Sequence, residues 1–261
     1  MSDVDADHSP VLFSATGRVA VLTLNRPEAR NAVNPELTAA LSAAMDRFES
    51  DPDLWAAVLT GAPPTFCAGA DLKAILDGRV DELSDRHGFA GLTRRARTKV
   101  LIAAVEGAAL AGGTELVLAC DLVVASESAT FGIPEVKRSL VANAGGLVRL
   151  PQKVPVNVAM ELALTGDPFS ARRAYEFGLV NELCEPGTAL ERALVLAERI
   201  CANAPVAVRE SRAVTERSGR LSEQDAWAAS QAAFDTALTS EDGREGLTAF
   251  VEKRPPVWVG R

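Results

Sequence analysis

Histidine is almost absent from this chain of 261 residues, which contains only His8 and His87. The GxSxG turn that carries the nucleophile of many serine hydrolases is also missing, so the sequence does not support a serine triad. Neither a GxxxxGK[ST] phosphate loop nor a GxGxxG dinucleotide motif is present. The sequence therefore offers no argument for a reaction that uses ATP or NAD.

Paired cysteines are lacking as well. The four cysteines are widely spaced, and no two of them form a CxxC pair. We therefore expect reduced thiols, with neither a disulfide framework nor a bound metal. Cys67 lies inside one of the motifs described below, but small half-buried cysteines more often pack than react, so we interpret it as a packing residue.

Long apolar runs and clusters of basic residues are also absent. No run approaches the roughly 20 residues that cross a bilayer, so no membrane contact is expected. The chain has 27 basic and 35 acidic residues, and this net charge of −8 argues against a nucleic-acid partner. Its acidic, polar start is unlike a targeting presequence, which predicts a disordered arm over residues 1–10 and a cytoplasmic location.

Strand and helix patterns alternate along most of the chain, which indicates an α/β fold. The predicted strands are residues 11–14, 18–24, 55–59, 101–105, 122–125 and 179–183. The predicted helices in this part are residues 35–48, 156–164 and 171–177. From residue 189 onward almost every segment has helical periodicity, so the chain is expected to end in a helical region.

A run of small residues from Gly107 to Gly113 separates an apolar strand from a helix that starts near Thr114. We predict a tight loop here, and the free amides at the start of the helix favour an anion. Glu115 would lie in the first turn, close to the amide of Gly112, where it can exchange protons with a bound ligand.

Two further segments have a similar character. In the segment from Phe131 to Glu135, Pro134 is expected to open a second helix with Glu135 beside it. The segment from Phe66 to Asp71 can supply another backbone amide. For either glutamate alone, a role in capping the helix or complementing its dipole would be the simpler interpretation.

Four segments in this order resemble the crotonase, or enoyl-CoA hydratase/isomerase, superfamily over nearly the whole chain. They are Leu24–Ala32, Phe66–Lys73, Gly112–Glu115 and Phe131–Glu135. The resemblance implies a crotonase-like spiral of ββα units over residues 11–203. It also implies a C-terminal helical region, residues 204–261, that packs on neighbouring subunits in a homotrimer or in a hexamer of two trimers.

The same resemblance implies roles for individual residues. The amides of Ala70 and Gly112 would form an oxyanion hole for the negative charge that develops on an acyl thioester, and Glu115 and Glu135 would be the acid/base pair. Retention of both glutamates resembles the hydratases that add water to trans-2-enoyl-CoA and give 3-hydroxyacyl-CoA. Such a reaction needs no cofactor beyond the coenzyme A of the substrate. Which glutamate is acid and which is base stays open.

Several residues resemble contacts to substrate and coenzyme A. They are Arg30, Ala68, Ala70, Asp71, Leu72, Lys73, Phe250 and Lys253. Phe250 and Lys253 resemble residues that reach a ligand bound to the adjacent subunit. Asp71 also suits the N-cap of a short helix at residues 72–76. Glu28 stands where many relatives carry a lysine, which weakens the case for one phosphate contact.

Two alternatives remain beside hydration. The same scaffold can carry a 3-enoyl/2-enoyl isomerase or a specialised dehydratase, and residues 135–146 depart from the commoner hydratase pattern. A weakly catalytic acyl-CoA-binding protein is the other alternative. The acyl-tail pocket is expected to depend on residues 74–96, whose mixed composition predicts helix and loop without defining a chain length.

Overall fold

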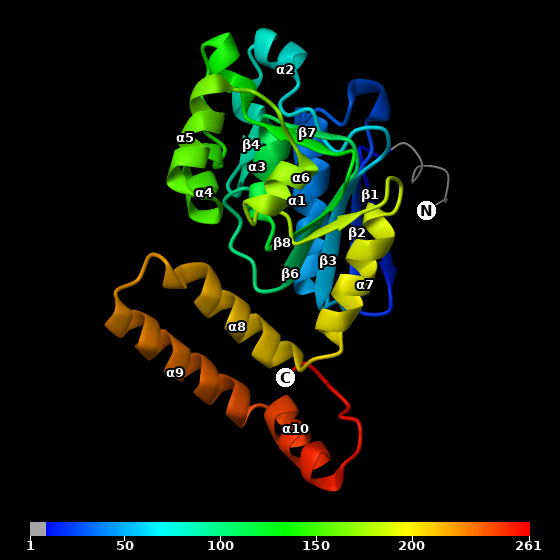
Figure 1. Ribbon diagram of the computed structural model, residues 1–261. Helices are drawn as coiled ribbons and strands as arrows, with labels where there is room; N and C mark the ends of the chain where they lie inside the picture. Colours follow the sequence, from blue (N-terminus) through cyan, green and yellow to red (C-terminus); the bar gives the residue numbers. More distant parts are fainter. Residues whose placement is uncertain (1–8) are drawn as a thin grey trace.

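The computed structural model describes residues 9–261, so His8 and most of the predicted N-terminal arm lie outside the described residues. Its centre is a six-stranded sheet with the order β1-β2-β3-β6-β8-β11 (Figure 1). These strands are β1 (Val11–Thr16), β2 (Val19–Leu24), β3 (Ala56–Gly61), β6 (Val100–Val105), β8 (Leu122–Ser126) and β11 (Glu182–Cys184). The β1–β2 pair is antiparallel and the other pairs are parallel. The predicted α/β class is confirmed.

Helices cover both faces of this sheet, which explains why β3 and β6 are apolar and buried along their whole length. On one face lies α7 (Ala189–Cys201), whose buried Ala189, Ala193 and Ala197 recur every four residues and allow close packing. The other face packs against α1 (Pro35–Ser50). Asn34 is the N-cap of this helix, and its side chain accepts a hydrogen bond from the Leu37 N–H.

A second sheet of three short strands stands beside the first. It consists of β7 (Ala108–Leu110), β9 (Thr130–Gly132) and β10 (Phe169–Ser170). The prediction of a loop throughout residues 107–113 was wrong, because Ala109 pairs with Phe131 and forms a further bridge to Cys67. These partners are distant in sequence, so local pattern could not reveal the strand.

The remaining elements before the C-terminal helices are short. They are α2 (Leu72–Leu76), α3 (Gly112–Ala119), α4 (Gly146–Lys153), α5 (Val156–Thr165), α6 (Ala171–Glu176), β4 (Ser84–Asp85), β5 (Gly88–Phe89) and the 3-10 helices η2 (Pro27–Ala29), η3 (Val80–Leu83) and η4 (Pro134–Arg138). Helix α4 was not predicted. Strand β11 starts later than predicted because the Leu179 and Val180 amides both donate to Ala174 O and close the end of α6.

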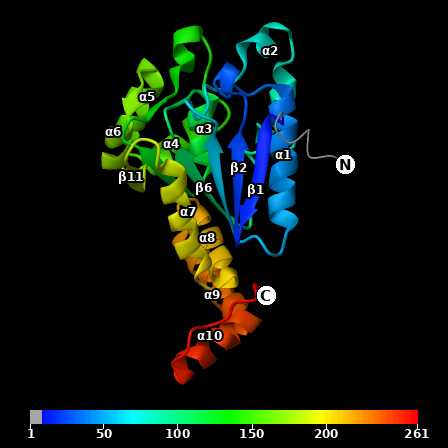
Figure 2. The same cartoon turned by 90° about the vertical axis from the view of Figure 1, so that its right-hand side faces the viewer.

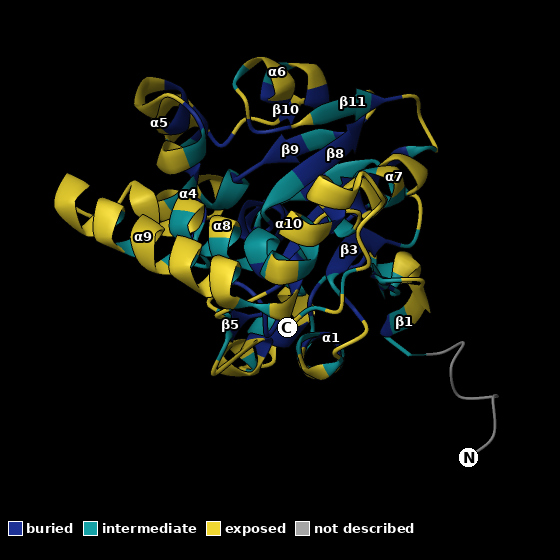
Figure 3. Cartoon of the chain, turned by 90° about the horizontal axis from the view of Figure 1, so that it is seen from below, coloured by how far each residue is buried: buried dark blue, intermediate teal, exposed yellow. Residues whose placement is uncertain are grey.

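The chain ends in α8 (Pro205–Ser218), α9 (Glu223–Thr239) and α10 (Glu241–Glu252), as the helical periodicity predicted. These helices extend away from the sheets (Figure 2). No residue of α9 is buried, and most of that helix is exposed when viewed from below (Figure 3). Trp227 and Phe234 are 70% and 59% exposed. Within residues 9–261, no helix combines the length and apolar character that a membrane crossing needs.

Candidate active site

Glu115 lies in the first turn of α3, as predicted, and all eight residues of this helix are buried. Only 3% of Glu115 is exposed. Its Oε1 accepts a hydrogen bond from the Gly146 backbone amide at 2.8 Å. Because Gly146 is the first residue of α4, the carboxyl group connects the starts of two helices.

The segment that carries Ala70 packs directly against the start of α3. A Cβ placed on Gly69 would lie 3.0 Å from the Gly112 nitrogen and 2.8 Å from Ala111 Cβ. Val33 N donates to Gly69 O, and Asp71 N donates to Val33 O, so this side of the segment is held by Val33. The structure therefore brings together the two backbone segments that the sequence analysis singled out.

The amides of Ala70 and Gly112 are available to a ligand. Among residues 9–261, neither amide donates to a backbone or side-chain acceptor. Gly112 is at the N-terminus of α3, where helix geometry leaves amides without partners. Two free donors on adjoining segments are the arrangement that stabilises an oxyanion.

Tight packing and backbone strain hold this arrangement. Ala111 has φ 50° and ψ −125°, a conformation that costs an alanine energy and that must be maintained by its surroundings. A Cβ on Gly113 would lie 2.1 Å from the Cys67 carbonyl oxygen, so only glycine fits there. Cys67 itself is buried, and burial raises the pKa of its thiol to about 12, which suits the predicted packing role.

Glu135 lies in η4, directly after β9 and Pro134, so the predicted helix is a 3-10 helix. Its Oε2 is buried and has no hydrogen-bond partner among the described residues. Burial raises the pKa of Glu135, while its own backbone amide and Arg138 lower it. A buried carboxyl oxygen without a partner is costly to maintain, and it suits a site that receives a polar ligand.

The two glutamates influence each other electrostatically. Burial raises the pKa of Glu115 to about 7, and the charge of Glu135 contributes to this increase. The Gly146 and Ala144 amides and Arg149 act in the opposite direction. A carboxyl group with a pKa near neutrality can both accept and donate a proton, as acid/base catalysis requires.

The raised pKa of Glu115 predicts a pH-dependent stability. The carboxyl would titrate at 4.5 in the unfolded chain and at about 7 in the folded one. Folding favours the neutral form, so the contribution of Glu115 to the free energy of unfolding should be most favourable below pH 4.5 and fall by about 3 kcal/mol as pH rises to 7. Urea unfolding of the parent and Glu115→Gln across pH 4–8 checks this. Parallel curves for the two proteins would contradict it.

Not all of the predicted ligand contacts gather at this site within one chain. Leu72 and Lys73 are exposed on α2, and the exposed Arg30 lies beside the loop, since its carbonyl accepts the Ala68 amide. Phe250 and Lys253 lie at the end of α10, far from α2 (Figure 1). One chain by itself therefore does not bring these two residues to the loop of Ala70.

Asp71 has the structural role that its sequence context suggested. It is the N-cap of α2, and its side chain accepts the Lys73 amide. It also forms an ion pair with Arg26 at 3.1 Å, in which both side chains are less than one-fifth exposed. Arg26 is therefore not a free cation for a phosphate, whereas Lys73 is exposed and has no ion pair with any residue of the described range 9–261.

Replacement of Asp71 should cost stability in two steps. Asp71→Ala removes both the cap and the ion pair, and we expect a loss of about 1–2 kcal/mol in the free energy of unfolding. Asp71→Asn keeps a capping oxygen and should lose less, because only the ion pair is affected. Urea unfolding of the three proteins measures both steps. Equal losses in the two variants would show that capping is unimportant.

Two residues that contribute to the site were not predicted from the sequence. The Gly146 amide holds Glu115, and the Phe89 ring would lie 2.5 Å from a Cβ on Gly112. Gly145 was a usable signal for the first, because glycine is among the residues that suit the N-cap of a helix. Nothing local marks Phe89, which reaches the site through the β4–β5 hairpin.

Comparisons with known proteins agree with this description. The family described as enoyl-CoA hydratase/isomerase matches residues 14–261. Enoyl-CoA hydratase EchA19 of Mycobacterium tuberculosis is 40% identical over 96% of each chain. Mevalonyl-coenzyme A hydratase sidH of Aspergillus fumigatus is 42% identical over 93% of this chain and 92% of its own. A crystal structure of an enoyl-CoA hydratase from M. tuberculosis H37Rv superposes with a TM-score of 0.94 at 49% identity, over 97% of this chain and all of that one. This superposition confirms the fold expected from the sequence resemblance.

Proposed function

This chain belongs to the enoyl-CoA hydratase/isomerase family, and from that premise we propose that it adds water reversibly to a trans-2-enoyl-CoA and gives a 3-hydroxyacyl-CoA. The observation that carries this proposal is the buried Glu115, whose pKa is raised in part by the charge of Glu135, in the first turn of the helix that begins at Gly112 and packs against the segment of Ala70. Relatives that catalyse hydration of different CoA thioesters lie at similar identity.

In the proposed reaction, the thioester oxygen accepts the amides of Ala70 and Gly112. One of the two glutamates takes a proton from water as the water oxygen attacks Cβ, and the electron pair of the double bond moves toward the thioester. The other carboxyl gives a proton to Cα, so one water is consumed and the pair of glutamates still holds one proton, whose return to the donating carboxyl restores the starting state. The unpartnered Oε2 of Glu135 supports a water contact there, while Gly146 orients Glu115. No cofactor beyond the coenzyme A of the substrate is needed.

Coenzyme A is proposed to lie along the loop that carries Ala68, Ala70 and Asp71, with Leu72, Lys73 and Arg30 near its nucleotide part. Exposure of Lys73 and Arg30 supports this proposal, because cations that are free in the protein can pair with phosphates. Phe250 and Lys253 would act on the ligand of an adjacent subunit.

We also propose a homotrimer, alone or paired into a hexamer, because Phe250 and Lys253 would reach a ligand only on an adjacent subunit. Trp227, Phe234 and Leu238 recur at helical spacing along one face of α9, and all three are exposed in the single chain. Phe234→Glu should lower the mass measured by light scattering, because it introduces a charge into this face. Thr236→Glu, on the opposite face of the helix, should leave the mass unchanged. Equal masses for both variants would place the interface elsewhere.

The proposed reaction is tested by the loss of enoyl-thioester absorbance when purified protein is added to crotonyl-CoA. A medium-chain and a long-chain 2-enoyl-CoA, assayed in parallel, would rank chain lengths. A 3-enoyl-CoA serves as the substrate of the rival isomerase. Turnover of the 3-enoyl substrate alone would show that the protein is an isomerase and not a hydratase. CoA binding without any turnover would show that it is an acyl-CoA-binding protein.

A further inference from the structure

A cavity of about 790 Å³ lies between the sheet and the C-terminal helices, and its lining includes neither of the two glutamates nor the segments of Ala70 and Gly112. It is bounded by the end of α3, by α4, by the end of α7 and by one face of α8. Its size is that of a site for a small organic molecule. The proposed hydration reaction makes no use of it.

The face of α8 that borders the cavity carries small side chains beside the larger Val208, Arg212 and Glu216. Ala204, Ala207, Ser211 and Thr215 follow each other at intervals of three or four residues and line the cavity. A helix that packs on a core normally presents large apolar residues on this face, yet α8 buries only Pro205 and Val206. The space beneath α8 is therefore left open by the sequence itself.

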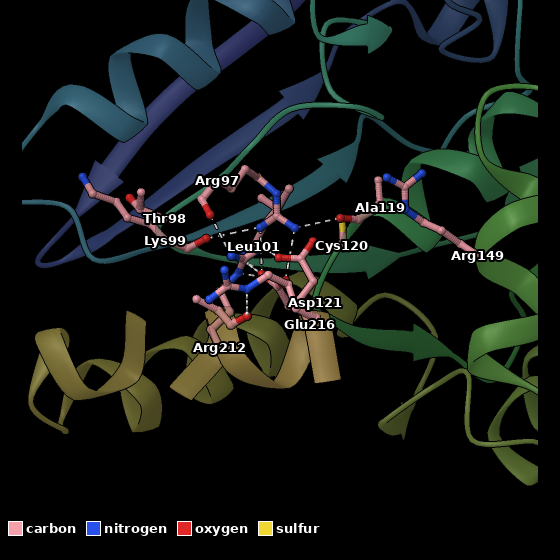
Figure 4. Close-up of polar contacts among 12 residues, drawn as sticks. Arg97, Thr98, Lys99, Leu101, Ala119, Cys120, Asp121, Arg149, Arg212 and Glu216 are labelled. Carbon is pink, nitrogen blue, oxygen red and sulfur yellow. Dashed lines mark hydrogen bonds and ion pairs between the residues drawn. The ribbon is translucent and has the colours of Figure 1, made fainter. Parts of the chain in front are cut away.

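Basic residues dominate the cavity wall. Six cationic side chains line it, against only two carboxylates, Asp121 and Glu216. Figure 4 shows that Asp121 is already engaged, since it pairs with Arg97 at 2.8 Å and with Arg212 at 3.0 Å. Glu216 pairs with Arg212 at 3.2 Å. Both carboxylates are thus already paired with Arg97 or Arg212, whose side chains are largely buried.

Three of the other cations have no carboxylate partner. Among residues 9–261, Arg149, Lys153 and Arg220 form no ion pair; they donate to uncharged oxygens of Thr93, Cys120 and Gln152. Burial and nearby cations lower the pKa of both Arg149 and Lys153. In a chain with a net charge of −8, this local excess of positive charge favours a bound anion.

The other end of the cavity is apolar. Leu122, Ile200 and Val208 line it near the first turns of α8, whereas Arg220 follows the last turn. Helix α8 runs from the end of α7 toward α4, so the two ends of the cavity are separated along its length (Figure 1). An occupant that matches both ends needs an anionic head and an apolar body.

We propose that this cavity is a binding site for a small amphipathic phosphate monoester. Its phosphate would contact Arg149, Lys153 and Arg220, and its hydrocarbon part would extend toward Ile200 and Val208. Phosphate is favoured over a single carboxylate because it offers three acceptor oxygens and up to two charges to three cations that have no carboxylate partner among residues 9–261.

Calorimetric titration with hexyl phosphate and with inorganic phosphate tests the site. One hexyl phosphate should bind per chain, and Arg220→Gln and Lys153→Gln should each weaken this binding at least about tenfold. Lys153→Arg should retain binding, since it keeps the charge. Ala207→Leu should weaken the binding of hexyl phosphate and leave the binding of inorganic phosphate unchanged, because the larger side chain fills only the apolar end of the cavity. Arg220 is exposed, so its variant is expected to fold.

Two controls separate this site from other surfaces. Arg86→Gln removes a cation that is 76% exposed and outside the cavity, and Lys73→Gln removes one beside the proposed coenzyme A site. Neither should change hexyl phosphate binding. The proposal is overturned by absence of saturable binding, by equal weakening in Arg86→Gln, or by loss in Lys73→Gln. A changed oligomeric mass in Ala207→Leu without ligand binding would assign the cavity to a second copy of the chain and overturn it too.

Discussion

Glu115→Gln should lower kcat for crotonyl-CoA hydration by about 10²–10⁴-fold and leave the affinity for CoA nearly unchanged. The side-chain carbonyl of glutamine can still accept the Gly146 amide, so the connection between α3 and α4 is kept. What is lost is a group that exchanges a proton near neutral pH. Initial rates from enoyl-thioester absorbance, together with CoA titrations, separate the loss of chemistry from a loss of binding.

Two further variants show whether the loss of rate in Glu115→Gln is specific to the active site. Glu191→Gln makes the same chemical change at an exposed position on α7 and should have the rate of the parent. Glu135→Gln should also reduce kcat, and the double variant should lose much less than the product of the two single losses, because the two groups act as a unit. Full activity in Glu115→Gln would remove this residue from the proposed mechanism.

Gly112→Ala should lower kcat by about 10²–10³-fold, the typical effect of losing one oxyanion donor. The added Cβ would lie 2.5 Å from the Phe89 ring, which is too close for any real contact, so the backbone at Gly112 or the ring must move. Because Phe89 is packed in the core, we expect displacement of the amide. Steady-state rates with crotonyl-CoA measure the effect.

The matched control is Gly219→Ala, where an added Cβ meets no atom within 4 Å and φ is −69°. This variant should have normal activity. Combining Gly112→Ala with Phe89→Leu should recover part of the rate, since a smaller side chain leaves room for the methyl group. A parent-like rate in Gly112→Ala would show that this amide does not contribute to the reaction.

Local features of the sequence sufficed for a large part of the fold. Strands β1 and β2, helix α1, strands β3 and β6 and the helical C-terminal region were all predicted from the pattern of apolar residues. Two positions in the site were also predictable: Glu115 in the first turn of α3 and Asp71 as the N-cap of α2. Such features depend on residues within one or two turns of each other.

Other parts of the site arise only when distant segments meet. Strand β7 exists because Ala109 lies between Cys67 and Phe131, and the Gly146 amide reaches Glu115 across 31 residues of sequence. The approach of Gly69 to Gly112, which places the two free amides on adjoining segments, depends on the same packing.

Chemical identity and geometry thus have different origins in this protein. The residue types and their order along the chain, through the resemblance to the crotonase superfamily that they carry, indicated which groups can hold an anion and exchange protons. The raised pKa of Glu115, the unpartnered Glu135 oxygen and the cavity beneath α8 follow from burial and from contacts between distant segments. Burial changes the energy of a charge and sets which polar groups find partners, and it is defined only once the chain has packed.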